Sequence, residues 1–377
     1  MQNRIKALIK NFNKYNIDGY IIPKNDEFFS EYTNKDRLNF ISNFNGSAGL
    51  AVITLKKNYL FVDGRYTLQA KQQSGKKFKI IEIHKYLPKN IIKNLRLGFD
   101  PHLFTKKNLN SLFGNLIKLA SIKENLVDKI YKKKLPKQKK FFSLNKKSAG
   151  ESHGSKINKI ANILKTKKVD YLFISSPENV AWLMNIRGYD SPTSPIPNCR
   201  LIINKNKKVF LIVKKESVQK IILKKKLKLS QIIDPNKFDD FIKKLNGNKF
   251  IIDPLTCSVF NEEIIKSNFK IIKEDDPCYK LKSIKNITEI NHTINAHIED
   301  GLALTKFIYW IKNVNKKQIT EIQAKNKLEK FRKLNKNYLF PSFDTIAGTG
   351  SNGAIVHYKV SKESNKIIKN NDLFLCD

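Results

Sequence analysis

The sequence predicts a mixed α/β (α+β) fold divided into two or three domains, and three observations carry this prediction. The chain has 377 residues, which at roughly 100–200 residues per domain is long enough to form several cores. Helix-like and strand-like patterns alternate over residues 1–135 and resume after a Lys-rich, Pro-containing segment at 131–140, a predicted linker. Hydrophobic residues make up 41% of the chain, as in folded globular proteins.

The first segment begins with a predicted helix, because Ile5, Leu8, Ile9 and Phe12 recur at spacings of three and four residues. A short buried strand follows at 19–23. After a Gly-rich turn at 44–49, two more apolar runs are predicted to pair as strands. These runs are 50–55 and 59–62.

The second segment repeats this order. A helical pattern includes Ile157, Ile160, Ile163 and Leu164, and it leads into a predicted strand at 171–174. A turn is expected at 175–178, followed by further strands at 201–203 and 209–213. The repetition predicts a duplicated architecture.

The third segment opens with an apolar stripe at four-residue intervals, formed by Ile290, Ile294, Ile298 and Leu302, which predicts a helix running towards Trp310. Thr320 and Gln323 have capping-box spacing and predict the start of a second helix. Turns containing Gly348, Gly350 and Gly353 follow, and a final strand is predicted at 372–377.

The net charge is +39, from 72 basic and 33 acidic residues, which is the electrostatic footprint of a nucleic-acid or anionic-membrane binder. However, only seven of the basic residues are arginine and 65 are lysine, spread over the whole chain. Arginine is the side chain that reads phosphate and guanine with two parallel hydrogen bonds. We therefore expect no specific nucleic-acid partner. A basic nucleic-acid binder stays as an alternative, to be tested by the salt dependence of filter binding.

The four cysteines are far apart and form no CxxC pair, so the sequence predicts neither a zinc ribbon nor a disulfide framework. A reducing, cytoplasmic location is the expectation. There is no run of 18 apolar residues, and we expect no membrane association.

Two residues are candidates for chemistry. His357 follows the Gly-punctuated turn and an apolar tripeptide, so we expect it at a strand end beside a cleft, either as a satisfied core histidine or as a functional one. Asp377 ends an apolar run, where a carboxylate is costly to bury unless it is paired or bound to a metal ion. It is a candidate metal ligand, and an aspartate facing solvent at a strand end is the alternative.

Several segments, in order and spacing, resemble the long, three-domain form of aminopeptidase P, the Xaa-Pro aminopeptidase of the pita-bread metallopeptidase superfamily. The first domain contributes 21–32, the FNGSAG segment 44–49, the DGRY segment 63–66 and residues 68–70. The linker is preceded by ENLVD at 124–128, and the second domain contributes AWLMNIRG at 181–188. The third contributes Lys285, Asn286, Glu289, Asp300, Trp310, SFDTI at 342–346 and NGAIVHY at 352–358.

The resemblance implies two creatinase-like N-terminal domains, 1–137 and 138–276, followed by the start of a pita-bread catalytic domain, 277–377. It implies a metalloaminopeptidase that removes the N-terminal residue from peptides with proline at position 2. The implied cofactor is a pair of divalent metal ions, most often Mn²⁺, and the implied assembly is a homodimer. His357 matches the family's catalytic and substrate-binding histidine, and Asp377 matches the first metal-binding aspartate.

The sequence departs from the family pattern after Asp377, because the four further metal ligands of the family lie downstream of that position. We therefore expect the chain to be a fragment that binds no stable dinuclear centre and is inactive alone. The alternative is a non-catalytic truncated paralogue that serves as a dimerisation or peptide-binding scaffold. An in-frame continuation beyond codon 377 that supplies the other ligands supports the fragment of an enzyme. A genuine stop codon there supports the scaffold. Arg65, in the DGRY segment, is expected either to bind substrate or to form a buried ion pair within its own domain.

Overall fold

The structure, a computed structural model, describes residues 1–115, 117–133, 139–223, 226–314 and 319–377. The chain divides into two compact units. Unit 1 comprises Met1–Lys146 and Glu151–Ile284, and unit 2 comprises Lys147–Gly150 and Lys285–Asp377. Within the described ranges, no helix combines the length and the apolar character that crossing a bilayer requires.

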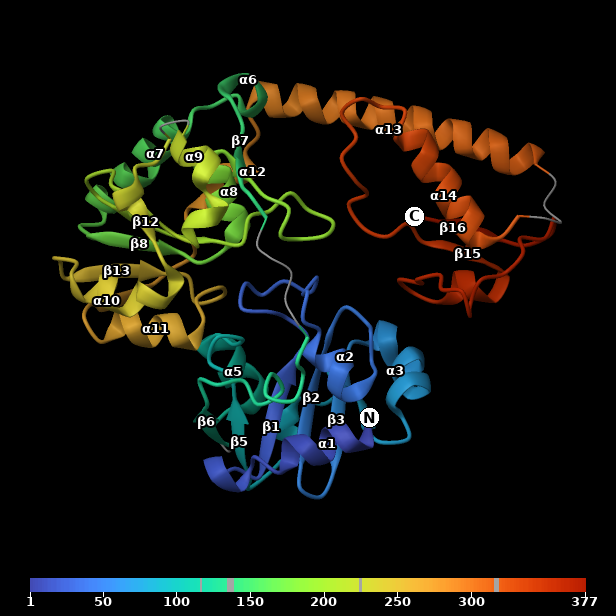
Figure 1. The fold of residues 1–377 in the computed structure, drawn as a ribbon, viewed down its shortest axis with the longest axis horizontal. Coiled ribbons are helices and arrows are strands. Elements are labelled where there is room, and N and C mark those ends of the chain that lie inside the picture. The colour runs from blue at the N-terminus through green and yellow to red at the C-terminus, as the bar shows by residue number, and fades with distance from the viewer. Residues whose placement is uncertain (116, 134–138, 224–225, 315–318) are drawn as a thin grey trace. The chain divides into compact units, whose positions relative to one another are not determined.

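The first half of unit 1 is built on a six-stranded mixed sheet with strand order β4-β3-β2-β1-β5-β6 (Figure 1). Its central strand β1 pairs antiparallel with β2 and parallel with β5. The outer pairs are β2 with β3, antiparallel, and β3 with β4 and β5 with β6, both parallel. The strands are β1 (Gly19–Pro23), β2 (Gly49–Thr54), β3 (Asn58–Val62), β4 (Lys79–Glu82), β5 (Arg96–Phe99) and β6 (Lys118–Ser121).

The second half of unit 1 repeats this sheet strand for strand. Its order is β12-β11-β10-β8-β13-β14, and each neighbouring pair has the same direction as its counterpart in the first sheet. The predicted duplication is therefore confirmed. The strands are β8 (Tyr171–Ile174), β10 (Arg200–Asn204), β11 (Val209–Ile212), β12 (Ile232–Ile233), β13 (Lys249–Ile252) and β14 (Lys270–Lys273). A separate antiparallel pair is formed by β7 (Phe142–Ser143) and β9 (Ile186–Arg187).

Both sheets are covered on two faces, which explains why their central strands read as unbroken apolar runs. In β1, Tyr20 and Ile22 belong to one core cluster and Ile21 to another, because successive side chains of a strand point to opposite faces. In β8, Leu172 and Phe173 divide between two clusters in the same way. The sequence pattern therefore predicted the strands, whereas the sharing of their residues between two cores follows from the helices on each side.

The helices of the first half cover its sheet with stripes of buried residues such as Ile5 and Leu8 of α1. They are α1 (Gln2–Ile9), α2 (Arg37–Ser42), α3 (Thr67–Ser74), α4 (Pro88–Ile91) and α5 (Lys106–Phe113). Helix α1 ends earlier than the sequence pattern indicates, and Phe12 is buried in the turn that follows it.

The helices of the second half are α7 (His153–Thr166), α8 (Pro177–Met184), α9 (Gln219–Leu223), α10 (Phe238–Lys243), α11 (Val259–Lys266) and α12 (Cys278–Ser283). The turn expected at 175–178 is only partly correct, since α8 begins inside it. Pro177 occupies the first turn of that helix, where its missing N–H costs nothing.

The two halves of unit 1 are joined at the start of α11. Val259 donates its backbone N–H to the carbonyl of Phe104 at 2.8 Å, and its side chain belongs to a core cluster otherwise formed by the first half. The ring of Phe260 lies against His102, with ring centres 4.0 Å apart. These contacts make one compact body from two similar sheets.

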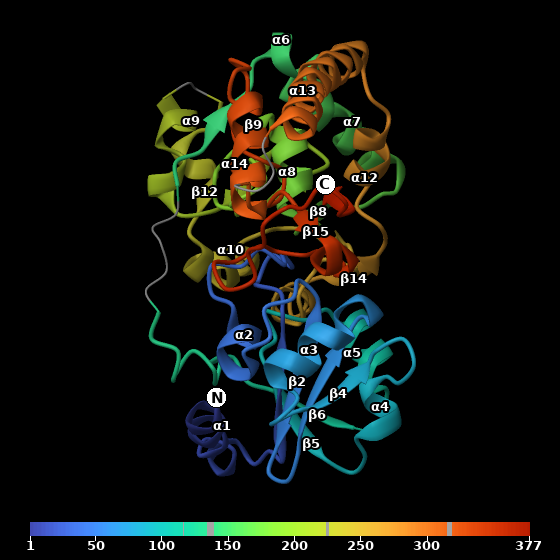
Figure 2. The same ribbon diagram turned by 90° about the vertical axis from the view of Figure 1, so that its right-hand side faces the viewer.

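In its described residues, unit 2 includes the helices α13 and α14, a small antiparallel sheet and connecting turns, and α14 lies beside α13 in Figures 1 and 2. Its elements are α13 (Ile287–Asn313), α14 (Glu321–Arg332), β15 (Ala347–Thr349) and β16 (Phe374–Cys376), with β15 and β16 antiparallel. A short helix, α6 (Lys146–Ala149), lies where the sequence ranges of the two units meet. The predicted capping box is confirmed, because Gln323 donates its N–H to the side chain of Thr320.

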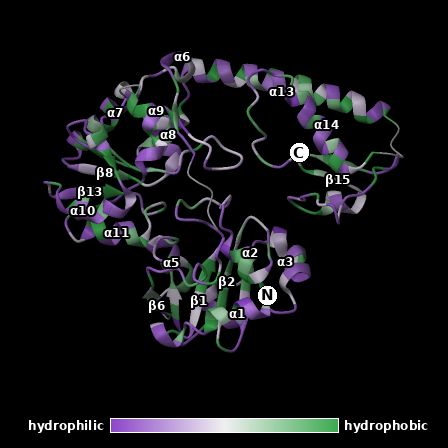
Figure 3. Cartoon of the chain, in the orientation of Figure 1, coloured by the Kyte–Doolittle hydropathy of each residue, from purple (hydrophilic) through white to green (hydrophobic). Residues whose placement is uncertain are grey.

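The apolar stripe of α13 is exposed along much of its length, and Figure 3 shows hydrophobic and hydrophilic residues alternating along this helix. Ile294 is 52% exposed and Ile298 64% exposed, whereas Phe307, nearer the end of the helix, is buried in the small core of unit 2. The predicted helix is confirmed, but its stripe contributes little to that core.

The linker predicted at 131–140 falls partly outside the described residues, which omit 134–138. The predicted boundary between the first two domains, at 137 and 138, lies entirely outside the described residues.

Candidate functional site

His357 lies in a turn just after η7 (Gly350–Ala354), a short 3-10 helix that folds back against β15 and β16. It does not lie at a strand end, as the sequence pattern suggested, and its side chain is exposed. The backbone of His357 has φ = 55°, in the left-handed region. For a residue other than glycine this conformation costs about 1–2 kcal/mol, so the surrounding structure must hold it in place.

The turn that carries His357 is held by a buried carboxylate, Glu321, which is 0% exposed. Its Oε1 accepts the backbone N–H of Thr349 at 2.8 Å and the side-chain amide of Asn352 at 3.0 Å. Its Oε2 accepts the hydroxyl of Tyr358 at 2.9 Å and the backbone N–H of Lys366 at 3.2 Å. A single side chain thus binds residues on both sides of His357.

Tyr358 and Asn352 extend this network. The side-chain amide of Asn352 also donates to the hydroxyl of Tyr358, at 2.8 Å, and to the carbonyl of Ser364, at 2.9 Å. Burial raises the pKa of Tyr358 to about 12, so its hydroxyl keeps its proton near neutral pH and can donate to Glu321. We call Glu321, Asn352, Tyr358 and Ser364 the Glu321 network.

Glu321 was missed by sequence reasoning. Its only signal was its place next to Thr320 in the capping box, and a glutamate in the first turn of a helix is ordinarily explained by the helix dipole. The contacts that give Glu321 its importance come from residues 28–45 positions further along the chain.

Asp377 follows β16 and continues its pairing. Its backbone N–H donates to the carbonyl of Ile346 at 3.0 Å, and its carbonyl accepts the N–H of Ile346 at 2.9 Å. The residue is exposed, which fits the alternative of an aspartate facing solvent as well as it fits a metal ligand. Asp377 and His357 therefore lie in the same unit.

The described residues do not make a dinuclear metal centre by themselves. Within the described part of the chain, no three His, Cys, Asp or Glu side chains gather closely enough to hold a metal ion. Two divalent cations need several anionic ligands that bridge and flank them, and Asp377 is a single carboxylate. We accordingly derive no chemical step through a metal ion from these residues.

Arg65 belongs to unit 1 and forms an ion pair there with Asp63, its Nε lying 2.8 Å from Oδ1. The pair is exposed at the surface rather than buried, since 45% of the Arg65 side chain is accessible. The hydrogen bond from Arg65 holds the pKa of the Asp63 carboxyl well below its usual range. His84 contacts the other oxygen of Asp63, at 3.2 Å.

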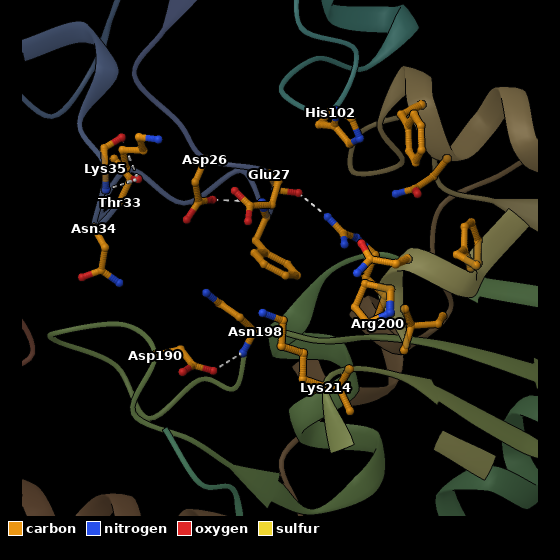
Figure 4. A pocket seen from close by; sticks show the side chains of 18 of the residues that line it. Asp26, Glu27, Thr33, Asn34, Lys35, His102, Asp190, Asn198, Arg200 and Lys214 are labelled. Carbon is orange, nitrogen blue, oxygen red and sulfur yellow. Dashed lines mark hydrogen bonds between the residues drawn. The ribbon is translucent and has the colours of Figure 1, made fainter. Parts of the chain in front are cut away.

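A cavity of about 790 Å³ lies in unit 1, lined by residues of both halves (Figure 4). Arg200 lies across from Glu27, donating to its backbone carbonyl, and stacks on Phe28 with 4.3 Å between the guanidinium carbon and the ring centre. His102 is held at the rim by Asp100, at 2.8 Å. The wall mixes acidic residues (Asp26, Glu27, Asp190, Asp239) with basic ones (Lys35, Arg37, Lys139, Arg200, Lys214), so it favours no single charge class of ligand.

Comparison with known families accounts for nearly the whole chain. The creatinase/prolidase N-terminal domain matches residues 4–130 and, in a second form, 132–289. Metallopeptidase family M24 matches residues 292–377.

Curated relatives match over most of this chain. A probable Xaa-Pro aminopeptidase P from Laccaria bicolor is 32% identical, with 99% of this chain and 62% of the relative covered. The Xaa-Pro aminopeptidase ApepP from Drosophila melanogaster is 32% identical, with 96% of this chain and 62% of the relative covered. The chain thus spans about 62% of the length of these relatives.

Among solved structures, the X-prolyl aminopeptidase from Caenorhabditis elegans, described as a cytosolic enzyme with a di-nuclear active site, has a similar fold. The TM-score is 0.89 at 24% identity, with 100% of this chain and 67% of that chain covered. At this identity the likeness supports the fold alone. The duplicated sheets and the three consecutive family matches agree: the chain carries two creatinase/prolidase N-terminal domains, followed by a segment that matches metallopeptidase family M24.

Proposed function

We propose that this protein acts as an Xaa-Pro aminopeptidase, a metal-dependent enzyme that removes the N-terminal residue from peptides with proline at position 2. The observation that carries the proposal is the match, over 96–99% of this chain, to relatives named Xaa-Pro aminopeptidase, together with its creatinase/prolidase and M24 family matches. The location proposed is the cytoplasm and the assembly a homodimer.

The proposed site is divided over several parts of the sequence. His357 is proposed to contact the peptide bond to be cleaved, through a hydrogen bond from its imidazole. Its exposed side chain on a firmly held turn supports this role. Asp377 is proposed as one ligand of a pair of divalent ions, Mn²⁺ by preference. These 377 residues alone are not proposed to hold that pair stably, because the described side chains lack the other ligands.

Arg65 is proposed as a second substrate-binding residue, through one of its N–H groups. In the described structure Arg65 pairs with Asp63, and an ion pair within its own domain is the alternative role.

The proposal is tested with protein expressed from the complete gene. In the presence of Mn²⁺, we expect release of the N-terminal residue from a short peptide with proline at position 2, and slower release when alanine replaces that proline. His357→Asn is expected to reduce kcat by at least 100-fold, in the range of a lost general acid–base group. His292→Asn, an exposed histidine on α13, is the matched control and is expected to keep full activity. Equal cleavage of both peptides, or an unaffected His357→Asn variant, contradicts the proposal.

A further inference from the structure

The turn around His357 combines backbone strain with direct links to a single buried group. His357 is in the left-handed conformation, and such residues persist only where the surrounding structure determines them strongly. Tyr358, the next residue, is locked by its hydroxyl, which donates to Glu321 at 2.9 Å. Asn352, five residues earlier, is bound to both oxygens of the same carboxylate, at 3.0 and 3.1 Å.

Glu321 is well suited to hold this turn. It lies in the first turn of α14, where the partial positive charge of the helix N-terminus stabilises a carboxylate. Its backbone is fixed as well, because its N–H donates to the carbonyl of Lys366 at 3.0 Å. Among the described residues Glu321 forms no ion pair with lysine or arginine, so all of its charge is compensated by hydrogen-bond donors from the two loop segments and by the helix.

We propose that Glu321 is a positioning residue for His357: through Asn352 and Tyr358 its carboxylate fixes both ends of the strained turn and so sets the direction of the imidazole. This inference rests on the proposed function for the meaning of His357, but the positioning itself does not depend on catalysis. Its test therefore uses the orientation of the imidazole as readout rather than peptide cleavage.

The experiment is NMR spectroscopy of the 377-residue chain labelled with ¹³C in its six histidines. The His357 ring signal is assigned from its absence in His357→Asn. In Glu321→Gln, which keeps the shape of the side chain, the new amide NH₂ cannot accept the hydrogen bonds that Oε2 accepts. We expect the His357 signal to split or at least to double in width. Amide hydrogen exchange at Thr349 and Lys366, whose N–H groups bind Glu321 directly, is expected to quicken by at least 10-fold.

The matched control is Glu329→Gln, the same change on the same helix. Glu329 pairs with Lys333 at 2.7 Å and belongs to no part of the Glu321 network, so its variant is expected to leave the His357 signal unchanged. A second variant, Tyr358→Phe, removes one hydroxyl and leaves the carboxylate its other donors. It is expected to alter the His357 signal in the same way and to keep the fold should Glu321→Gln lose it.

A single, unshifted His357 signal in a folded Glu321→Gln variant overturns the proposal, and so does an unchanged signal in Tyr358→Phe. The proposal is also overturned if amide exchange at Thr349 and Lys366 becomes faster while the His357 signal stays unaltered. In that case the Glu321 network stabilises the fold but does not orient His357. If Glu321→Gln alters the His357 signal but the wild-type protein expressed from the complete gene cleaves no peptide, the proposed function is contradicted and the positioning role still stands.

Discussion

The side-chain amide of Asn286 donates to the carbonyl of Ala149 at 2.9 Å, joining residues 137 positions apart in the sequence. Asn286 is also the N-cap of α13, where its Oδ1 accepts the N–H of Glu289 at 3.0 Å and the Glu289 side chain binds back to the N–H of Asn286. One residue thus starts the longest described helix and fixes it to the 147–150 segment of unit 2.

Replacing Asn286 by alanine is expected to destabilise the first turn of α13 by about 1–2 kcal/mol, because the cap and the link to Ala149 are lost together. This corresponds to a 5–30-fold loss of hydrogen-exchange protection in that turn. The comparison variant is Asn291→Ala, an exposed position on the same helix, where protection is expected to stay within about two-fold because alanine is the best helix former. Equal effects of the two variants contradict the capping role.

Gly150→Ala adds only one methyl group, but we expect it to destabilise the start of α13 strongly. The backbone of Gly150 has φ = 73°, a conformation that residues other than glycine rarely adopt. An added Cβ would also lie 2.1 Å from Oδ1 of Asn286. Both the turn and the Asn286 cap must therefore shift. We expect α13 to lose more protection than in Asn286→Ala. Gly154→Ala is the control, since the nearest atom to its added Cβ is 3.9 Å away, and it is expected to be neutral or slightly stabilising.

Arg37 and Asp128 form a two-point ion pair in unit 1, with Nε–Oδ1 and Nη2–Oδ2 distances of 2.8 and 2.9 Å. Asp128→Ala leaves the largely buried Arg37 and Lys35 without their counter-ion, and we expect a cost of about 2 kcal/mol, less than for a fully buried pair. Asp239→Ala, which breaks an exposed pair with Lys243, is expected to cost under about 0.5 kcal/mol. Urea unfolding of both variants measures the difference.

The ion pair between Arg37 and Asp128 also makes the stability of the fold depend on pH. Despite its partial burial, the hydrogen bonds from Arg37 and Lys35 lower the pKa of Asp128 below its ordinary value. A carboxyl group whose pKa is lower in the folded than in the unfolded state stabilises the fold at pH values above its pKa in the unfolded state. This contribution is lost as the pH falls through its pKa in the folded state. Wild type is therefore expected to lose stability more steeply than Asp128→Asn below about pH 4. Parallel acid-unfolding curves of the two proteins contradict this assignment.

Asp26 is expected to lower the stability of the fold as the pH rises, which is the opposite of the effect of Asp128. Burial, with a smaller contribution from Glu27, raises its pKa to about 6. The folded state then holds a proton that the unfolded state releases at lower pH, so stability falls as the pH rises from about 4 to 6. At about 1.36 kcal/mol per pKa unit the cost above pH 6 is about 2–3 kcal/mol. Asp26→Asn keeps an oxygen for the N–H groups of Phe28 and Ser30, and unfolding in urea at pH 7.5 should show it to be more stable than wild type.

Metal binding gives a further prediction. Because the described residues offer Asp377 without a cluster of further ligands, titration of the 377-residue chain with Mn²⁺ is expected to show only weak binding, with a Kd on the order of 0.1–1 mM or weaker. Asp377→Asn is expected to change the isotherm little. Two tight sites in isothermal titration calorimetry contradict the expectation, and their loss in Asp377→Asn would place Asp377 among the ligands.

Local patterns sufficed for much of the secondary structure. The five residues of β1 and the four of β8 were predicted from apolar runs alone, since a strand covered on both faces has no polar interruptions. The capping box at Thr320 was predicted because a cap is satisfied within three residues. The end of α1 and the start of α8 were less well predicted, because helix ends depend on the chain that packs against them.

The site was predicted less completely. His357 and Asp377 were predicted as site residues from their motif context, but the left-handed turn at His357 and the exposed position of Asp377 were not predicted. The role of Glu321 could not be seen in the sequence at all, since its partners Thr349, Tyr358 and Lys366 are separated from it by 28, 37 and 45 positions.

The sequence by itself determined the order of the domains, the strands of two similar sheets and the family, because apolar periodicity and short motifs are properties of neighbouring residues. The tertiary structure decided which side chains meet: Asn286 with Ala149, Arg37 with Asp128, and Glu321 with the turn that carries His357. The physical reason is that burying a charged or polar group is costly without partners. Those partners are brought together only when distant segments pack.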